Sequence, residues 1–400
     1  MSNVENKNAA MAIPPLLQLA FRPLFLGGTL FSVLAIAWWA YFWVSPFDWQ
    51  PYGGPIWWHG HEMLFGFGAA IVVGFLLTAV QNWTGVPGLK GAKLGVLAGA
   101  WLLGRLLIAF GGVLPGWLVA VGDISFLLLA SVAMAYPVLK AKQWRNLMFV
   151  PILLVLTLLN GFSHWGALNG NASLGIQALH GAIMLISLVI AILGGRVIPF
   201  FTSNASTYER KAGIGWLDGL SIGSIIALVI AGFVGFINVP SALLALVSLV
   251  AAVSNGARFL RWGISHTLKT PLLWSLHFSF IFIPIGMIAL FLYSMGILSS
   301  ISIALHCFTV GAMGGMILGM ISRVTLGHTG RKLQPPKLMT LAYACILLAA
   351  VMRVLLPAVF PALTNMGIAL AGVLWVIAYG VYLFYYAPML LTPRVDGRPG

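Results

Sequence analysis

Long apolar segments recur along the whole chain, and they leave little room for anything except membrane-spanning helices. A helix needs about 20 apolar residues to cross the hydrocarbon core of a bilayer. No connecting segment is long enough for a soluble domain. We therefore predict an all-α polytopic membrane protein, a single transmembrane helical domain over residues 1–400. The twelve predicted spans are 20–44, 57–80, 92–111, 115–138, 148–168, 174–201, 215–237, 239–263, 270–295, 300–323, 337–359 and 363–389.

Composition agrees with lipid as the surrounding solvent. Hydrophobic residues make up 60% of the chain and charged residues only 7%, whereas a soluble domain carries about 25% charged residues. The net charge of +14 is spread thinly between apolar segments, so we predict no nucleic-acid partner. Cys307 and Cys345 both lie inside apolar segments and predict no disulfide framework. Residues 1–18 lack the apolar core of a removable signal peptide.

Basic residues occupy every second loop. The alternate loops, at 45–56, 112–115, 166–174, 237–241, 296–300 and 358–363, contain no Lys or Arg. Because basic loops stay in the cytoplasm, this alternation predicts an inner-membrane protein with both termini cytoplasmic. The basic set is Lys7, Arg22, Lys90, Lys93, Lys140, Lys142, Arg145, Arg196, Arg210, Lys211, Arg258, Arg261, Lys269, Arg323, Arg331, Lys332, Lys337, Arg394 and Arg398.

Two arginines fall inside predicted spans instead. Arg105 and Arg353 both lie in the outer half of the membrane, as do the acidic residues Glu62 and Asp123. A buried arginine needs an acidic partner or a water-filled cavity. Two interpretations stay open: buried ion pairs or snorkelling, for example between Arg105 and Glu62, or an anionic cofactor such as a haem whose propionates lie between the arginines.

Histidines gather at one depth. Five of the eight are predicted in the outer third of the membrane on different helices, whereas His277 lies in an inner half and His266 and His328 in cytoplasmic loops. Neutral imidazole is a common ligand of copper, iron and zinc, although a single membrane histidine often only hydrogen-bonds to a neighbouring helix. The outer five are His59, His61, His164, His180 and His306.

Local spacing adds detail at two of the spans. A helix would turn the rings of His59 and His61 about 200° apart, so they would serve different partners, whereas an extended segment would let both face one metal. Gly311, Gly315 and Gly319 form a smooth stripe for close approach of a helix or a flat cofactor. The chain has no CxxCH, HExxH, Walker A or nucleophile-elbow motif, so any haem is held non-covalently.

Three stretches carry a family resemblance. They are Trp58–Met63 (WHGHEM), Gly194–Thr202 (GGRVIPFFT) and His306–Arg331, which ends in RVTLGHTGR. Together with Phe21-Arg22-Pro23 and Leu276-His277 they resemble the NnrS family of bacterial membrane proteins, over residues 18–390.

The resemblance implies a haem b- and copper-containing inner-membrane protein that relieves nitric oxide and nitrosative stress, with nitric oxide as a small-molecule ligand and a redox activity left open. Glu62 would orient a ligand or pass a proton, Arg105 and Arg353 would neutralise haem propionates, and His277 would serve a second, inner site with Arg323 or His328 nearby. The candidate outer ligands are His59, His61, His180 and His306.

Two other classes remain. Twelve spans also suit a proton-coupled or metal-substrate transporter that uses Glu62 and the histidines, although internal repeats are not evident. A membrane sensor is weaker because the chain has no signalling domain. The helix number also resembles haem–copper oxidases and nitric oxide reductases, but their adjacent His-His ligand pair is absent, which argues against such a centre.

Overall fold

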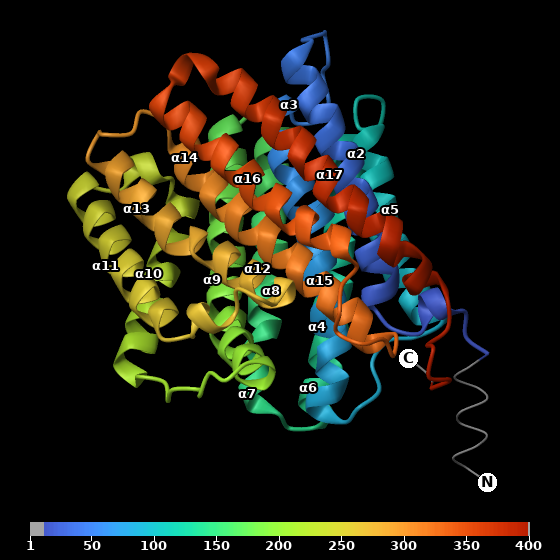
Figure 1. Cartoon of the computed structure of the whole chain (residues 1–400). Helices are drawn as coiled ribbons and strands as arrows, with labels where there is room; N and C mark the ends of the chain where they lie inside the picture. Colours follow the sequence, from blue (N-terminus) through green and yellow to red (C-terminus); the bar gives the residue numbers. More distant parts are fainter. Residues whose placement is uncertain (1–11, 399–400) are drawn as a thin grey trace.

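The computed structural model describes residues 12–398, and within that range it contains helices and no strand (Figure 1). Twelve helical segments are long and apolar enough to cross a membrane, and each overlaps one predicted span, so the polytopic all-α fold is confirmed. Lys7, one of the basic residues used above, lies outside the described residues.

Some spans are single helices and others are broken. The unbroken spans are α2 (Phe21–Val44), α5 (Ala92–Ala109), α6 (Gly116–Lys140), α9 (Ala172–Ala205), α10 (Gly215–Val234), α11 (Ser241–Leu260) and α16 (Lys337–Val359). The composite spans are α3 (Pro55–His61) with η2 (Glu62–Gly68) and α4 (Ala69–Thr84), α7 (Trp144–Leu147) with α8 (Phe149–Leu168), α12 (Pro271–Phe280) with α13 (Phe282–Ser294), α14 (Ile301–His306) with η5 (Cys307–Gly314) and α15 (Gly315–His328), and η6 (Pro361–Leu363) with α17 (Thr364–Leu391). Three further short helices are η1 (Pro15–Leu17), η3 (Phe236–Asn238) and η4 (Ile264–His266).

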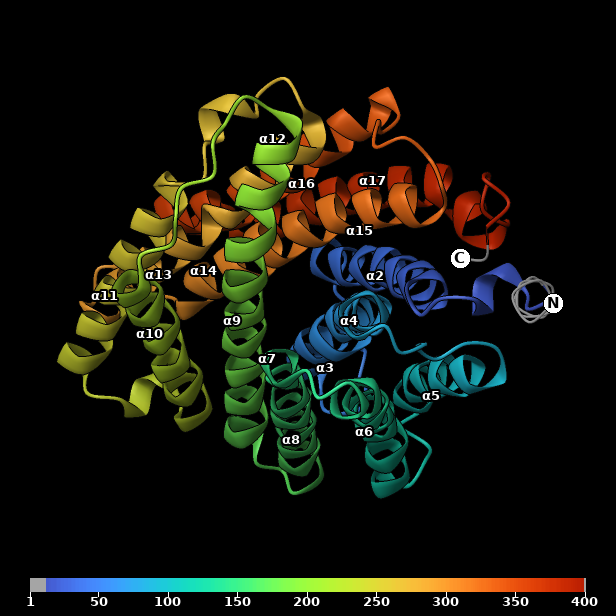
Figure 2. The ribbon, with the colours of Figure 1, turned by 90° about the horizontal axis from the view of Figure 1, so that it is seen from below.

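Four spans form the inside of the bundle. In the span α3–η2–α4, 83% of the residues of an 18-residue apolar stretch are buried inside the molecule. The corresponding fraction is 72% for α14–η5–α15 and 67% for both α9 and α12–α13, whereas it is at most 50% for every other span. Viewed from below, α4 and α9 lie centrally, with α5, α6 and α8 on one side and α10, α11 and α13 on the other (Figure 2). The outer spans present apolar side chains that imply contact with lipid.

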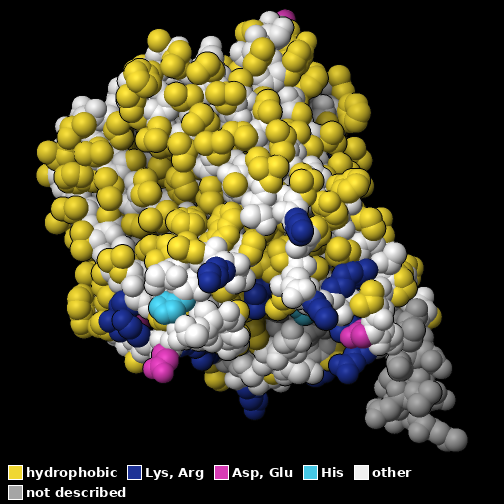
Figure 3. Space-filling view, viewed as in Figure 1, with side chains coloured by type: hydrophobic (Ala, Val, Ile, Leu, Met, Phe, Trp, Pro, Cys, Tyr) yellow, Lys and Arg dark blue, Asp and Glu magenta, His cyan; other side chains and the backbone are white. Residues whose placement is uncertain are grey.

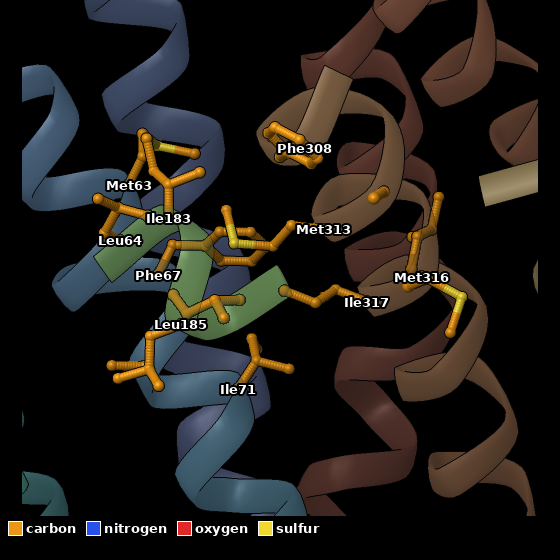
Figure 4. Packing of buried hydrophobic residues seen from close by; sticks show 14 of the residues in the cluster. Met63, Leu64, Phe67, Ile71, Ile183, Leu185, Phe308, Met313, Met316 and Ile317 are labelled. Atoms are coloured by element: carbon orange, nitrogen blue, oxygen red, sulfur yellow. The ribbon is translucent and has the colours of Figure 1, made fainter. Parts of the chain in front are cut away.

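Two of the inner spans change from α-helix to π-helix, and each change begins directly after a histidine. Segment η2 starts after His61, and η5 starts after His306. These segments approach each other closely, since a Cβ on Gly68 would lie 3.3 Å from Met313 Sδ. In Figure 4, Phe67 of η2 and Met313 of η5 point into the same space between the two segments. Because π-helical turns occur often at functional sites, the region where η2 and η5 meet is a candidate for the functional site.

Basic side chains gather at one end of the molecule. Figure 3 shows most of the visible Lys and Arg side chains along the lower end, below a broad apolar surface. Arg22 ties the two terminal spans together at that end by donating to the carbonyl oxygens of Leu390 at 2.9 Å and Thr392 at 2.8 Å. The largest boundary difference from the prediction lies in the tenth span, which continues past Arg323 to His328 and ends before Gly330, whose φ of +77° suits glycine. His328 therefore ends a helix and does not lie in a loop.

Candidate functional site

Helix α3 directs its two histidines to different neighbours. The ring of His61 stacks on Trp57, with centroids 4.3 Å apart, whereas the ring of His59 stacks on Trp39 at 4.2 Å. The segment is already helical at both residues, so the two rings serve different partners. They define two separate regions, which we call the polar cluster and the histidine cavity.

The polar cluster is a buried network that joins four membrane spans. His61 and Glu62 come from α3 and η2, Arg105 from α5 and Asp123 from α6, and α8 contributes Asn160 and His164. The most exposed of these residues is Arg105, at 6%. Each span thus places polar atoms at one point inside an otherwise apolar bundle, where hydrogen bonding is obligatory. The cluster consists of His61, Glu62, Arg105, Asp123, Asn160 and His164.

Arg105 lies between the two carboxylates of the cluster. Its Nη1 donates to Glu62 Oε1 at 2.7 Å, and its Nη2 donates to Asp123. Two glycines leave room for these groups. A Cβ on Gly66 would lie 2.4 Å from Arg105 Nη1, and one on Gly104 would lie 2.7 Å from Asp123 Oδ1. Arg105 therefore forms the ion pair with Glu62 that the sequence left open, and a second one with Asp123.

His61 faces oxygen atoms with both ring nitrogens. Its Nδ1 lies 3.0 Å from Glu62 Oε1, and its Nε2 lies 2.8 Å from Asn160 Oδ1. A protonated His61 donates to both, and its charge together with that of Arg105 balances the two carboxylates. In a membrane interior, where an unbalanced charge is costly, the cluster thus needs either that proton or a cation in its place.

Three members of the cluster could hold a metal ion. One ligand atom from each of His61, Asp123 and His164 lies within 4.8 Å of the other two, and two imidazoles with a carboxylate suit iron, copper or zinc. The remaining ring nitrogens have outer partners: Glu62 for His61, and the Tyr52 hydroxyl, 3.2 Å from His164 Nδ1. Burial and the charge of Asp123 raise the pKa of Tyr52 to about 12, so that hydroxyl stays protonated at neutral pH. Such outer contacts orient ligating histidines.

The histidine cavity lies on the other side of α3 and has a volume of about 230 Å³. His59, His180 and His306 line it from α3, α9 and α14, and most of the remaining lining is apolar. Met63 of η2 and Met313 of η5 contribute to the same wall, so both π-helical segments border the cavity. Three imidazoles from three inner spans therefore converge on one apolar space.

The imidazoles of the cavity have few hydrogen-bond partners. His306 Nδ1 lies 2.7 Å from the carbonyl oxygen of Ser302 and must donate to it, which leaves the lone pair of Nε2 free in the neutral ring. His59 Nδ1 is buried without any hydrogen-bond partner. Arg353 borders a hollow that continues from the cavity past His59 and His306, and it donates to Ser302 Oγ at 3.0 Å. Unpaired imidazole nitrogens beside an arginine can accept a metal-containing, anionic ligand.

Two of the sequence-predicted ligands lie apart from both regions. His277 has backbone carbonyl oxygens near both ring nitrogens, Leu273 O at 3.1 Å and Trp262 O at 3.3 Å. The ring of His328 packs against Phe21, with centroids 5.6 Å apart. The structure therefore does not bring either histidine to the cavity or to the polar cluster.

The sequence also missed members of the polar cluster. His164 and Asp123 were placed near the outer side but were not selected as ligands, and Asn160 was not singled out. The available signal was their depth: Asp123, Asn160 and His164 all fall near the level of Glu62 in spans four and five. What depth alone does not give is the rotation of each helix about its axis.

Comparison with known families agrees with these features. Residues 15–394, nearly the whole chain, match the family described as NnrS protein. Comparison with curated proteins finds no match. The matched range contains every span, the polar cluster and the histidine cavity. The chain therefore belongs to the NnrS family.

Proposed function

We propose that this chain is a haem- and copper-binding protein of the bacterial inner membrane that relieves nitric oxide stress. The observation that carries the proposal is the convergence of His59, His180 and His306 on one buried apolar cavity. Membership of the NnrS family leads us to expect haem, copper and nitric oxide as ligands. The histidines that line the cavity are the residues of this chain that could bind them. Redox turnover of nitric oxide is part of the proposal.

The donor set of the cavity fits a histidine-ligated haem. The imidazole nitrogens of His59, His180 and His306 would hold the haem iron, and Arg353 would balance the charge of the haem carboxylates. The volume of about 230 Å³ holds a small ligand, and a haem also requires flexible side chains such as Met63 and Met313 to move. A bound haem would supply a redox-active iron that could coordinate nitric oxide and pass on electrons from an external donor.

The polar cluster fits a copper ion or a proton store beside that cavity. In either case Glu62 forms a hydrogen bond with Nδ1 of His61, and Arg105 forms ion pairs with the carboxylates of Glu62 and Asp123. Glu62 and Met63 are neighbours in η2, one in the cluster and the other in the cavity wall. A proton held on His61 is thus stored next to the proposed reaction space, where reduction of nitric oxide consumes protons.

The orientation follows from the charge asymmetry. We propose that the basic end lies in the cytoplasm with both termini, so that the polar cluster and the histidine cavity lie toward the outer side. Alkaline phosphatase and fluorescent-protein fusions in successive loops test this topology. Phosphatase activity after Lys140 but not after Asn169 would contradict it.

The first experiment is to purify the protein in mild detergent and record its reduced-minus-oxidised visible spectrum with an iron and copper assay. A b-type spectrum that collapses in one or two of His59→Ala, His180→Ala and His306→Ala supports the haem site. Loss of copper in His61→Ala or His164→Ala supports the second site. His277→Ala is the matched control, because its ring contacts only backbone carbonyls among its hydrogen-bond partners.

Folded protein without iron or copper would overturn the proposal. The alternative is then a proton-coupled transporter, which the hydrogen-bonded chain from Tyr52 through His164 and Asp123 to His61 favours. A proton-coupled flux into vesicles that disappears in Glu62→Gln would identify that function.

A further inference from the structure

A second hollow lies at the basic end of the molecule, far along α9 from the histidine cavity. It has a volume of about 390 Å³ and is lined by residues of α9, α10 and α11 and of the 206–214 connection. Nothing in the proposed function uses it. Its charged lining residues are Arg196, Arg210, Lys211, Asp218, Arg258 and Arg261.

One of its arginines is already neutralised. Arg258 is 8% exposed, donates from Nε to Asp218 at 2.6 Å and from Nη1 to Ser221 Oγ at 3.0 Å. Gly195 makes room for it, since a Cβ there would lie 2.4 Å from Arg258 Nη2. This ion pair between a buried guanidinium and a partly exposed carboxylate occupies the single carboxylate among the lining residues of the hollow.

The other four cations have no acidic partner within the described residues, 12–398. Arg261 donates to the carbonyl oxygen of Ala212 at 2.9 Å, and the nearest polar contact of Arg196 is Met148 Sδ at 3.6 Å. Arg210 and Lys211 are exposed at the rim. Four positive charges therefore border one concave space and form no ion pair among the described residues, although Glu209 adjoins Arg210 in the sequence.

Exposed apolar residues adjoin lining residues in the sequence. Phe200, Trp216 and Leu260 are 46%, 71% and 77% exposed, and they neighbour Pro199, Leu217 and Arg261. Tryptophan is typical of the membrane interface, and basic hollows between spans at the cytoplasmic level suit anionic head groups. The segments that line the hollow thus carry both basic lining residues and exposed apolar side chains.

We propose that this hollow binds a phosphate group, carried by an anionic phospholipid or present as free phosphate. Guanidinium groups match phosphate oxygens with paired donors, and Arg196 and Arg261 provide such donors from different helices. A basic loop that only directs topology needs neither a hollow between helices nor a buried Arg258 that is paired with Asp218. The ligand would join α9 to α10 and α11 at this end.

The test uses the full chain in a neutral detergent. Phosphatidylglycerol, phosphatidylcholine and inorganic phosphate are titrated separately, with bound species counted by native mass spectrometry and the melting temperature recorded. Stabilisation by phosphatidylglycerol alone identifies a lipid site, and equal stabilisation by inorganic phosphate identifies a free-phosphate site. Absence of both effects, or equal binding of phosphatidylcholine, overturns the proposal.

Variants localise the effect. The double variant Arg196→Gln/Arg261→Gln is expected to weaken binding at least about tenfold, because it removes two charge-assisted contacts. Lys90→Gln/Lys93→Gln removes the same charge from another basic loop and should leave binding unchanged. If the first variant fails to fold, Lys211→Gln, whose side chain is exposed, is expected to weaken binding about threefold. Equal weakening by the Lys90/Lys93 variant would show that net charge, and not the hollow, binds the ligand.

Discussion

The polar cluster and the histidine cavity lie on opposite sides of α3, and they differ in how many of their polar atoms are hydrogen-bonded. In the cluster, each imidazole, carboxylate and amide takes part in a hydrogen bond, and Arg105 Nε is its one fully buried polar atom without a partner. In the cavity, His59 Nδ1 is buried without a partner and His306 bonds only within its own helix. A satisfied network holds helices together, whereas unpaired imidazoles are available to a ligand. We therefore expect the polar cluster mainly to stabilise the fold and the histidine cavity to be the region that is open to a ligand.

The largest effect is expected from Arg105→Met. Removing the guanidinium takes away one of the two positive charges that balance Glu62 and Asp123, so a net buried negative charge remains and the free energy of unfolding should fall by about 3–5 kcal/mol. Unfolding in mixed micelles by a chemical denaturant measures this loss. Arg353→Met is the matched control, because Arg353 donates to Ser302 and to no carboxylate within the described residues. Equal losses for the two variants would remove the distinction between the regions.

A methyl group placed beside the same guanidinium should have a smaller effect. Gly66→Ala puts a Cβ 2.4 Å from Arg105 Nη1 and 2.7 Å from Phe31 Cε1, and overpacking of this kind costs about 1–3 kcal/mol. Gly99→Ala in α5 meets nothing within 4 Å and should leave stability unchanged or slightly raised. The two melting temperatures are compared, and a tolerated Gly66→Ala would mean that the cluster is not tightly packed.

A third substitution examines the cavity without its ligand. His180→Ala removes a ring that makes no hydrogen bond in the described structure, so in metal-free protein the free energy of unfolding should change by less than about 1 kcal/mol. His164→Ala, by contrast, breaks contacts with Asp123 and Tyr52 and should destabilise the metal-free protein by more. Denaturant midpoints of the two variants decide the order, and the reverse order would contradict the assignment.

The smallest effect is expected at an ion pair near the C-terminus that is more exposed than the ion pairs of Arg105. It shows how much such a pair contributes to stability when water surrounds it. Arg394 donates to both carboxylate oxygens of Asp396, and these hydrogen bonds lower the pKa of Asp396. A lowered folded-state pKa stabilises the protein above the unfolded pKa, and that stabilisation declines as the pH falls from the unfolded pKa through the folded pKa. Asp396→Asn should therefore lower the melting temperature slightly at pH 7, by less at pH 3, and not at all only below the folded pKa. A large shift would mean that the pair supports more of the fold than its exposure indicates.

The sequence predicted the fold better than the site, for physical reasons. Apolar length and loop charge determine the spans, so all twelve were confirmed. The depth of a residue along a helix also follows from the sequence, which is why Arg105 and Glu62 are predicted at the same depth in the membrane. The rotation of each helix about its axis does not follow from the sequence, because apolar residues face both the lipid and the interior of the bundle. Asp123 and His164 were therefore missed, and the change to π-helix after His61 and His306 was not predicted, since residue spacing hardly differs.

The position of both histidines on the seven-residue helix α3 has a thermodynamic consequence. If a ligand on His59 shifts this helix, it also changes the free energy of protonating or metallating His61. Reciprocity then requires that a proton or metal on His61 change the affinity of the cavity by the same factor. Coupling of about 1.4 kcal/mol would make cavity affinity tenfold dependent on the occupancy of the polar cluster. The two regions would then respond to pH as one unit, although no atom belongs to both.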